Sequence, residues 1–380
     1  MSGVSVIIPA FNHARFIAQT LDCVLAQTYP AQEIIVVDDG STDNTQGTLD
    51  TYRNRIRVIY QRNQGPSAAR NAGISVSRGE YLLFLDADDL VPPDKLKLQV
   101  AALATRPEMA LVYSAWQYVD ASGEQVLAEM HPQKEGQLLT ELLLRAFFFP
   151  IAAAVVRRDC VERVGMFDPT LRASEDTDLW MRMARAGFNF GYIDRPLFKY
   201  RLVSGSASRN VAGQMKSEFA RLDKFFADPA LPQELRALQG EAYSILWFES
   251  GARHYQIGDP QNGCAHIRQA IQLSPTRSRD ENWLLDWIAG FASEPTVQDP
   301  HRLIDFVFDH LPPEAATLRS LRQRAHGRYH VAAAFSAHQN HDPKKIRQHV
   351  LPALLGDPTI IRNRGFIRIA VQSLLDRRQV

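Results

Sequence analysis

Two acidic clusters, each placed directly after a short apolar run, are the residues of this sequence best suited to chemistry. They are Asp38 and Asp39, after the run 33–37, and Asp86, Asp88 and Asp89, after the run 80–85. A continuous apolar run is typical of a strand buried on both faces of a parallel sheet, and ligands of such sheets bind beyond the carboxyl ends of the strands. Because carboxylates hold hard divalent cations, which in turn hold phosphates, the pattern predicts metal-assisted handling of a nucleotide diphosphate.

The composition is that of an ordinary globular protein. The chain has 380 residues, of which 45% are hydrophobic and 22% charged, and this length suits two domains of about 100–200 residues each. The formal net charge is only +1, so the overall charge does not indicate binding to nucleic acid, and we expect no nucleic acid partner. Residues 319–380 differ, with 12 basic and 3 acidic residues and therefore a local charge of +9.

Cysteine spacing and hydropathy predict a cytoplasmic protein. Cys23, Cys160 and Cys264 form no CxxC pair, which argues against a disulfide framework and structural zinc. The first expected strand starts at Val4, which leaves no room for a signal peptide. The most apolar stretch, 138–156, is interrupted by charged residues and a proline, so we expect no membrane span.

Hydrophobic periodicity predicts two domains of different classes. Apolar runs that read as strands alternate with helical patterns in the first part, which indicates right-handed βαβ units and a mostly parallel sheet flanked by helices. The expected strands are 4–9, 33–37, 56–60, 80–85 and 111–113. Beyond this part the pattern is helical only. We therefore expect an α/β domain at 1–215 and an all-helical domain at 216–380.

A short internal repeat favours helical hairpins in the second domain. The segment YQIGDP at 255–260 recurs as HQNHDP at 338–343. Each copy predicts a helix, a tight Asp-Pro turn and a second helix that ends before a proline. This order is typical of stacked hairpins of the tetratricopeptide type, which bind acceptors or partners or build homo-oligomers.

The P-loop, GxGxxG, HExxH and GxSxG motifs are absent from this chain. Five other motifs follow one another in order: VSVIIPAFN at 4–12, IIVVDDGSTD at 34–43, NQGPSAARNAG at 63–73, LFLDADD at 83–89 and SEDTDLW at 174–180. Together they resemble family 2 of the glycosyltransferases. The resemblance covers about residues 1–210. It implies a GT-A fold and an inverting transfer from a nucleotide-diphosphate sugar, with UDP as the first expectation.

The resemblance also implies roles for individual residues. The nucleotide-sugar site would comprise Pro9, Ala10, Phe11, Asn12, Asp38, Asp39, Arg70, Asp86 and Arg201. Among these, Asp39 would hydrogen-bond the base, Arg70 would lie near the base and diphosphate, and Asp86 would lie against the ribose. Asp88 would bind Mn²⁺ or Mg²⁺, which stabilises the leaving diphosphate.

The motif at 174–180 holds the candidate catalytic base. The resemblance favours Asp176, with Glu175 and Asp178 as alternatives. The motif would open a helix over 178–186, whose N-terminus would keep a carboxylate ionised, as a base requires. One position departs from the family pattern: after Tyr200 and Arg201, the expected histidine near the metal is replaced by Val203. Metal coordination would then need water or another residue.

Other features stay open between two interpretations. Trp116 and Tyr118 either stack on a sugar ring or pack in the core, and Phe147–Phe149 line either an acceptor pocket or a buried segment. In the C-terminal helix, Ile360, Ile367, Val371, Leu374 and Leu375 share one face. We prefer closure of the helical core for this face, and peripheral contact with an anionic membrane is the alternative.

The sequence therefore predicts a cytoplasmic bacterial-type glycosyltransferase that acts on a glycan, lipid-linked or protein acceptor. A different class remains open, in which a catalytically weak sugar-nucleotide-binding scaffold recruits partners through its helical domain. A nucleotidyltransferase would need a glycine- and lysine-rich triphosphate loop, which the sequence lacks.

Overall fold

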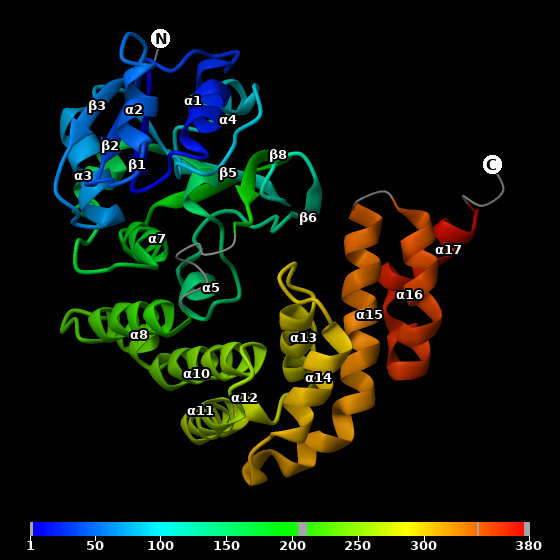
Figure 1. Ribbon diagram of the computed structural model, residues 1–380. Coiled ribbons are helices and arrows are strands. Elements are labelled where there is room, and N and C mark those ends of the chain that lie inside the picture. The colour runs from blue at the N-terminus through cyan, green and yellow to red at the C-terminus, as the bar shows by residue number, and fades with distance from the viewer. Residues whose placement is uncertain (1–2, 204–210, 340–341, 376–380) are drawn as a thin grey trace. The chain divides into compact units, whose positions relative to one another are not determined.

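The structure, a computed structural model, describes residues 3–203, 211–339 and 342–375. The chain divides into two compact units, with the boundary between Phe225 and Phe226 (Figure 1). This boundary lies beyond the expected one at 215/216, because helix α8 (Val211–Phe226) is part of the first unit.

The first unit is built on a sheet that has eight strands within the described residues. Its strands are β1 (Val4–Ala10), β2 (Glu33–Asp38), β3 (Arg57–Tyr60), β4 (Tyr81–Phe84), β5 (Met109–Val119), β6 (Val126–Met130), β7 (Ala154–Arg157) and β8 (Asn189–Arg201). Their order is β3-β2-β1-β4-β7-β5-β6, and β8 pairs with β5. The part β3-β2-β1-β4 is parallel, whereas β7 is antiparallel to both its neighbours.

The register of the parallel strands places both acidic clusters at one edge. Ala10 at the end of β1 pairs with Asp38 at the end of β2, and Ile7 pairs with Phe84 at the end of β4. The chain therefore leaves all three strands on the same side of the sheet, as expected for a ligand site in a parallel sheet.

Helices flank this sheet and support the site. They are α1 (Ile17–Leu25), α2 (Thr45–Asp50), α3 (Pro66–Val76), α4 (Lys95–Thr105), α5 (Leu139–Leu143), α6 (Arg158–Arg163), α7 (Glu175–Arg185) and α8. Helix α3 packs closely on β1, since a Cβ atom at Gly73 would stand 2.4 Å from Cγ2 of Ile7. Helix α7 starts at Glu175, three residues earlier than its predicted start at Asp178.

The second unit is helical throughout its described residues. Its longer helices are α10 (Gln239–Gln256), α11 (Pro260–Leu273), α13 (Glu281–Ala292), α14 (Pro300–Asp309), α15 (Arg322–Gln339), α16 (Pro343–Gly356) and α17 (Arg364–Leu375). The two Asp-Pro repeats start α11 and α16, where Asp259 and Asp342 accept hydrogen bonds from the N–H groups of Asn262 and Lys345. The predicted pair of helical hairpins is therefore present.

The last helix does not present the predicted apolar face to the core. Its buried residues are Phe366, Ile369, Ala370 and Ser373, while Val371, Leu374 and Leu375 are exposed. The prediction that these last three join Ile360 in closing the core is wrong, because the helix turns Phe366 and Ile369 inward instead. Among the described residues, no helix is both long and apolar enough to cross a bilayer.

Candidate active site

The loops that follow β1 and β2 are interlocked. Asn12 has φ +58°, and its Oδ1 accepts hydrogen bonds from the backbone N–H groups of Thr42 (2.7 Å) and Asp43 (3.3 Å). Its own N–H donates to Oγ of Ser41 at 3.0 Å. Asn12 therefore joins the two loops, and α1 begins only at Ile17. Beside it, Pro9 is half-buried, Ala10 buried and Phe11 exposed.

The carboxylate of Asp39 accepts three hydrogen bonds from the segment between β3 and α3. Its Oδ1 accepts from Nε2 of Gln61 (2.7 Å) and from the N–H of Gln64 (2.8 Å), and its Oδ2 accepts from the N–H of Gly65 (2.7 Å). Asp38 accepts from the N–H of Ser41, and its Oδ2 is buried with no partner among the described residues. In the arrangement that the structure shows, Asp38 and Asp39 both stabilise the loops around the site.

The turn that holds Asp86, Asp88 and Asp89 concentrates negative charge. Burial and the neighbouring Asp86 raise the pKa of Asp88 above its ordinary value. Burial, followed by the charges of Asp88 and Asp86, raises the pKa of Asp89 well above its ordinary value. Asp86 and Asp88 keep part of their side chains open to solvent, whereas Asp89 is buried. A cation arriving here would relieve the mutual repulsion of these carboxylates.

Arg201 lies beneath this turn. Its Nε donates to the backbone oxygen of Asp88 at 2.6 Å, and its Nη1 donates to that of Ala121 at 2.9 Å. Its backbone N–H donates to Oδ1 of Asp89, and its guanidinium stands 4.9 Å from the centroid of the Phe16 ring. Only 2% of Arg201 is exposed. The residue therefore supports the turn from below.

Arg70 joins the two acidic motifs of the site. From α3, its Nη2 donates to Oδ1 of Asp86 at 2.6 Å and its Nη1 donates to Oε1 of Glu175 at 2.5 Å. Although burial alone would lower the pKa of Arg70, the two carboxylates raise it above its ordinary value, so the guanidinium stays charged. Like Arg201, Arg70 is 2% exposed. One buried cation thus brings the residues after β4 and the start of α7 into one site.

Asp176 has an altered acidity. Burial, followed by the charge of Glu175, raises the pKa of Asp176 to about 7, against the weaker effect of a hydrogen bond from the N–H of Thr177. Burial and Glu175 therefore outweigh the helix N-terminus, which was expected to keep this carboxylate ionised. A pKa near neutrality is the value that suits a general base.

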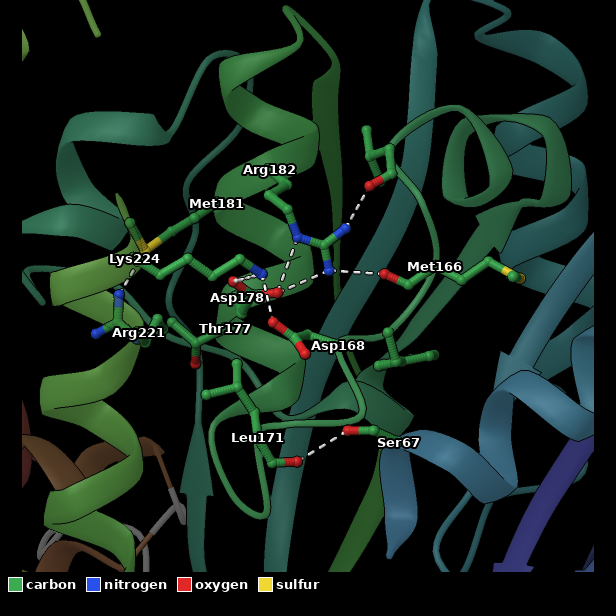
Figure 2. Close-up of polar contacts among 12 residues, drawn as sticks. Ser67, Met166, Asp168, Leu171, Thr177, Asp178, Met181, Arg182, Arg221 and Lys224 are labelled. Carbon is green, nitrogen blue, oxygen red and sulfur yellow. Dashed lines mark hydrogen bonds and ion pairs between the residues drawn. The ribbon is translucent and has the colours of Figure 1, made fainter. Parts of the chain in front are cut away.

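Asp178, by contrast, has both carboxylate oxygens engaged in the packing of α7. Oδ2 of Asp178 accepts from Nε of Arg182 at 2.8 Å, and Oδ1 lies 3.5 Å from Nζ of Lys224. Figure 2 shows Asp178 between these two basic side chains. Arg182 also donates to the backbone oxygen of Met166, and Lys224 donates to Asp168. These contacts attach α8 to α7, and they make Asp178 the weakest of the three candidates for the base.

One residue near the site was missed at the level of sequence. His13 lies in the loop after β1, and its Nε2 stands 3.9 Å from Oδ2 of Asp88. The available signal was its position, since the residue directly follows Asn12 beyond the carboxyl end of a central strand. Of the aromatic candidates, Trp116, Phe147 and Phe149 are buried, whereas Phe148 is 47% exposed.

The arrangement fits a divalent cation that is held jointly with a substrate. Within the described residues there is no group of three or more histidine, cysteine or acidic side chains placed to hold a metal on their own. Mg²⁺ is commonly bound by one or two carboxylates together with phosphate oxygens. Asp88 beside a bound diphosphate would meet that description.

Comparison with known proteins places the chain among transferases. Residues 5–165 match the family described as glycosyl transferase family 2. The putative teichuronic acid biosynthesis glycosyltransferase TuaG of Bacillus subtilis is 31% identical over 211 residues, which are 54% of this chain and 82% of that protein. An uncharacterized glycosyltransferase of Rickettsia typhi is 29% identical over 251 residues, which are 64% of this chain and 77% of the relative.

Two solved structures share the fold. S. aureus TarS 1-349 in complex with UDP-GlcNAc has a TM-score of 0.51 and 20% identity, over 86% of this chain and 88% of that chain. The mannosyltransferase PcManGT from Pyrobaculum calidifontis, in complex with GDP-Man and Mn²⁺, has a TM-score of 0.52 and 18% identity, over 84% and 87% of the two chains. At these identities the likeness concerns the fold, and it agrees with the expected GT-A architecture followed by helices.

Proposed function

The chain belongs to glycosyltransferase family 2, and from that premise we propose that it transfers one sugar, with inversion, from a nucleotide-diphosphate sugar to an acceptor hydroxyl. The observation that carries this proposal is the double contact of Arg70 with Asp86 and Glu175. It brings the motif that would hold the donor next to the motif that would hold the base. Inversion needs both at once, since it is a single in-line displacement.

Asp176 is the proposed base. The acceptor O–H gives its proton to the carboxylate while the acceptor oxygen bonds to the anomeric carbon. The bond from that carbon to the phosphate oxygen breaks, and the nucleoside diphosphate leaves with its electrons. With a pKa of about 7, Asp176 is substantially ionised at neutral pH and still basic enough to accept the proton. A Mn²⁺ or Mg²⁺ ion bound through Asp88 would neutralise charge on the leaving diphosphate.

We propose UDP as the nucleotide of the donor and a bacterial surface glycan as the acceptor. TarS in complex with UDP-GlcNAc supports the first choice, while PcManGT in complex with GDP-Man keeps GDP as the competing one. TuaG, named for teichuronic acid biosynthesis, supports a polysaccharide acceptor. A lipid-linked glycan and a protein are the alternative acceptors. The exposed ring of Phe148 is a candidate surface for an acceptor sugar.

The competing function is a sugar-nucleotide-binding scaffold with weak catalysis. Val203 in place of a histidine favours it. The near-neutral pKa of Asp176 favours the enzyme. A general base needs such a pKa, whereas a protein that only binds sugar nucleotides does not.

Calorimetric titration of UDP, GDP and dTDP, each with and without Mn²⁺, tests the donor site. We expect one nucleotide to bind in a metal-dependent manner, and Asp88→Ala to abolish that dependence while the protein stays folded. When the matching nucleotide sugar is supplied, release of the nucleoside diphosphate by the wild type, and loss of that release in Asp176→Asn with nucleotide binding retained, would support the transferase over the scaffold. A folded wild type that binds no nucleotide would overturn the donor-site assignment.

We also propose that the C-terminal helices contact an anionic membrane surface. On α16, Lys344, Gln348, Leu351 and Leu355 recur at helical spacing and are exposed, the two leucines by 63% and 68%. On α17, the exposed residues Arg364, Arg368, Val371 and Leu375 repeat that spacing. Because residues 319–380 carry +9, a second copy would be repelled and an anionic lipid attracted.

Flotation with liposomes tests this contact on the full chain. We expect binding to vesicles that contain phosphatidylglycerol, and none to neutral vesicles at the same lipid concentration. The double variant Leu351→Ser/Leu355→Ser should lose binding, while Leu273→Ser, an exposed leucine of α11, should not. Unchanged flotation of the double variant would sink the proposal, and the oligomeric state, measured by light scattering, would then identify a second copy as the occupant.

A further inference from the structure

Three basic side chains lie around the aspartate turn, and they differ in access to solvent. Arg70 pairs with Asp86, and Arg201 donates to the backbone oxygen of Asp88. Each of these arginines is 2% exposed. The side chain of His13 is 31% exposed, and it lies beside the carboxylate of Asp88, which is 21% exposed. A ligand that enters from solvent toward Asp88 would therefore meet His13 before either arginine.

The position of His13 is set by the two interlocked loops. Its N–H donates to Oγ1 of Thr45 at 2.9 Å. The N–H of Ala14 donates to Asp43, and the N–H of Asn12 donates to Oγ of Ser41, so the residues on either side of the histidine are also held. The backbone that carries the imidazole is thus held at the edge of the sheet by hydrogen bonds to the loop after β2, which reduces the ordering entropy lost on binding.

The hydrogen bonds of the ring determine which nitrogen carries the proton. The backbone N–H of Phe11 donates to Nδ1 of His13 at 3.3 Å. In a neutral imidazole one nitrogen accepts and the other donates, so Nε2 carries the hydrogen. The 3.9 Å between Nε2 and Oδ2 of Asp88 is too long for a hydrogen bond. The Nε2–H donor is therefore free to meet an oxygen atom that arrives beside Asp88.

We propose that His13 donates a hydrogen bond from Nε2 to the diphosphate of the donor substrate and of the leaving nucleotide. This role rests on the proposed function, since it takes the diphosphate to lie beside Asp88. In this role His13 would act as a hydrogen-bond donor to phosphate oxygens, beside the carboxylate of Asp88.

The test compares nucleotides that differ only in the second phosphate. Calorimetry gives the affinities of the best-bound nucleoside diphosphate and of its monophosphate, each with Mn²⁺, for the wild type, His13→Ala and His13→Gln. His338→Ala, in the second unit, controls for the loss of a histidine elsewhere. Binding of Mn²⁺ without nucleotide is measured by electron paramagnetic resonance in the same proteins.

We expect His13→Ala to weaken the diphosphate about tenfold, in line with the loss of a hydrogen bond to a charged group, and to leave the monophosphate unchanged. His13→Gln, which retains an N–H donor, should recover much of that loss, and Mn²⁺ binding should not change in any variant. Equal diphosphate affinity in wild type and His13→Ala would overturn the inference, as would equal losses for both nucleotides. A wild type that binds no nucleotide would instead overturn the proposed function.

Discussion

Nη1 of Arg70 donates to Oε1 of Glu175 at 2.5 Å, although the two residues are 105 positions apart in the chain. The same guanidinium donates to Asp86, so one cation compensates carboxylates from two distant motifs. The side chain of Arg70 is 3% exposed and that of Glu175 is 12% exposed, which leaves little water to replace the contact. The contact therefore supports both the fold and the assembly of the site.

Replacing Arg70 by methionine should destabilise the protein strongly. Removing one partner of a buried ion pair typically costs about 3–5 kcal/mol, because the remaining charge stays buried. Urea unfolding measures the loss. Arg106→Met is the matched control, since Arg106 pairs with Glu135 at the surface and an exposed pair contributes about 0–1 kcal/mol. Equal losses in the two variants would show that the contacts of Arg70 stabilise the fold no more than the surface pair of Arg106 does.

Asp176→Asn should remove transfer but keep the donor site. A positioned general base contributes about 10²–10⁴-fold to the rate, so kcat should fall by that factor. The calorimetric Kd of the nucleotide should stay close to that of the wild type. Glu175→Gln is the informative comparison, because it changes the partner of Arg70 as well as the charge near Asp176. If Asp176→Asn leaves kcat unchanged, another group is the base.

The pH dependence of kcat should report the acidity of Asp176. Because the base acts deprotonated and its pKa is about 7, activity should rise through pH 7 and level off above it. The free energy of unfolding should decrease as the pH rises toward this pKa. The reason is that the folded state retains a proton that the unfolded state, with an ordinary pKa of 3.8, has already released. The free energy of unfolding should therefore fall between about pH 4 and 7 in the wild type, and Asp176→Asn should lack this part of the decrease.

Much of the fold follows from local patterns. The apolar runs before Asp38 and Asp86 are short and uninterrupted, so the strands β2 and β4 and the alignment of their ends could be predicted. The Asp-Pro turns of the second unit could be predicted as well, because Asp259 and Asp342 accept hydrogen bonds from residues only three positions further along the chain.

Residue roles within the site were harder to predict, because they depend on contacts between distant segments. Nothing near Arg201 in sequence reveals that it lies under the turn of Asp88, 113 positions away. The pKa of Asp176 depends on burial, which no motif records. For the same reason the apolar face of α17 was assigned wrongly: which of two faces turns inward is decided by the neighbours of Phe366, not by its own helix.

Arg201→Lys should weaken the aspartate turn. A lysine keeps the charge but cannot donate at once to the backbone oxygens of Asp88 and Ala121, as the planar guanidinium does. We expect a lower melting temperature and a loss of metal-dependent nucleotide binding, since Asp88 would no longer be held in place. Arg195→Lys, at an exposed pair with Asp94, is the control. Unchanged nucleotide affinity in Arg201→Lys would show that the turn is held by other contacts.

The contacts of Asp178 yield a prediction that separates stability from catalysis. Asp178→Asn should leave kcat almost unchanged and lower the free energy of unfolding by about 1.5–3 kcal/mol, the range for a hydrogen bond to a charged group. Lys224→Ala should cost less, because the side chain of Lys224 is 46% exposed and solvent screens its attraction for Asp178. Urea unfolding and initial rates, measured on the same samples, test both.

The fall in the free energy of unfolding at acid pH provides a second test of the contacts between α7 and α8. Although burial favours its protonated form, Asp168 accepts hydrogen bonds from Lys224 and Thr170, which lower its pKa to about 2. A depressed pKa stabilises the folded state above the ordinary value of 3.8, and this contribution is lost as pH falls toward 2. Lys224→Ala should therefore flatten the fall in unfolding free energy between about pH 4 and 2. An unchanged slope would mean that Lys224 does not hold Asp168 in solution, and that α8 is attached through its other contacts alone.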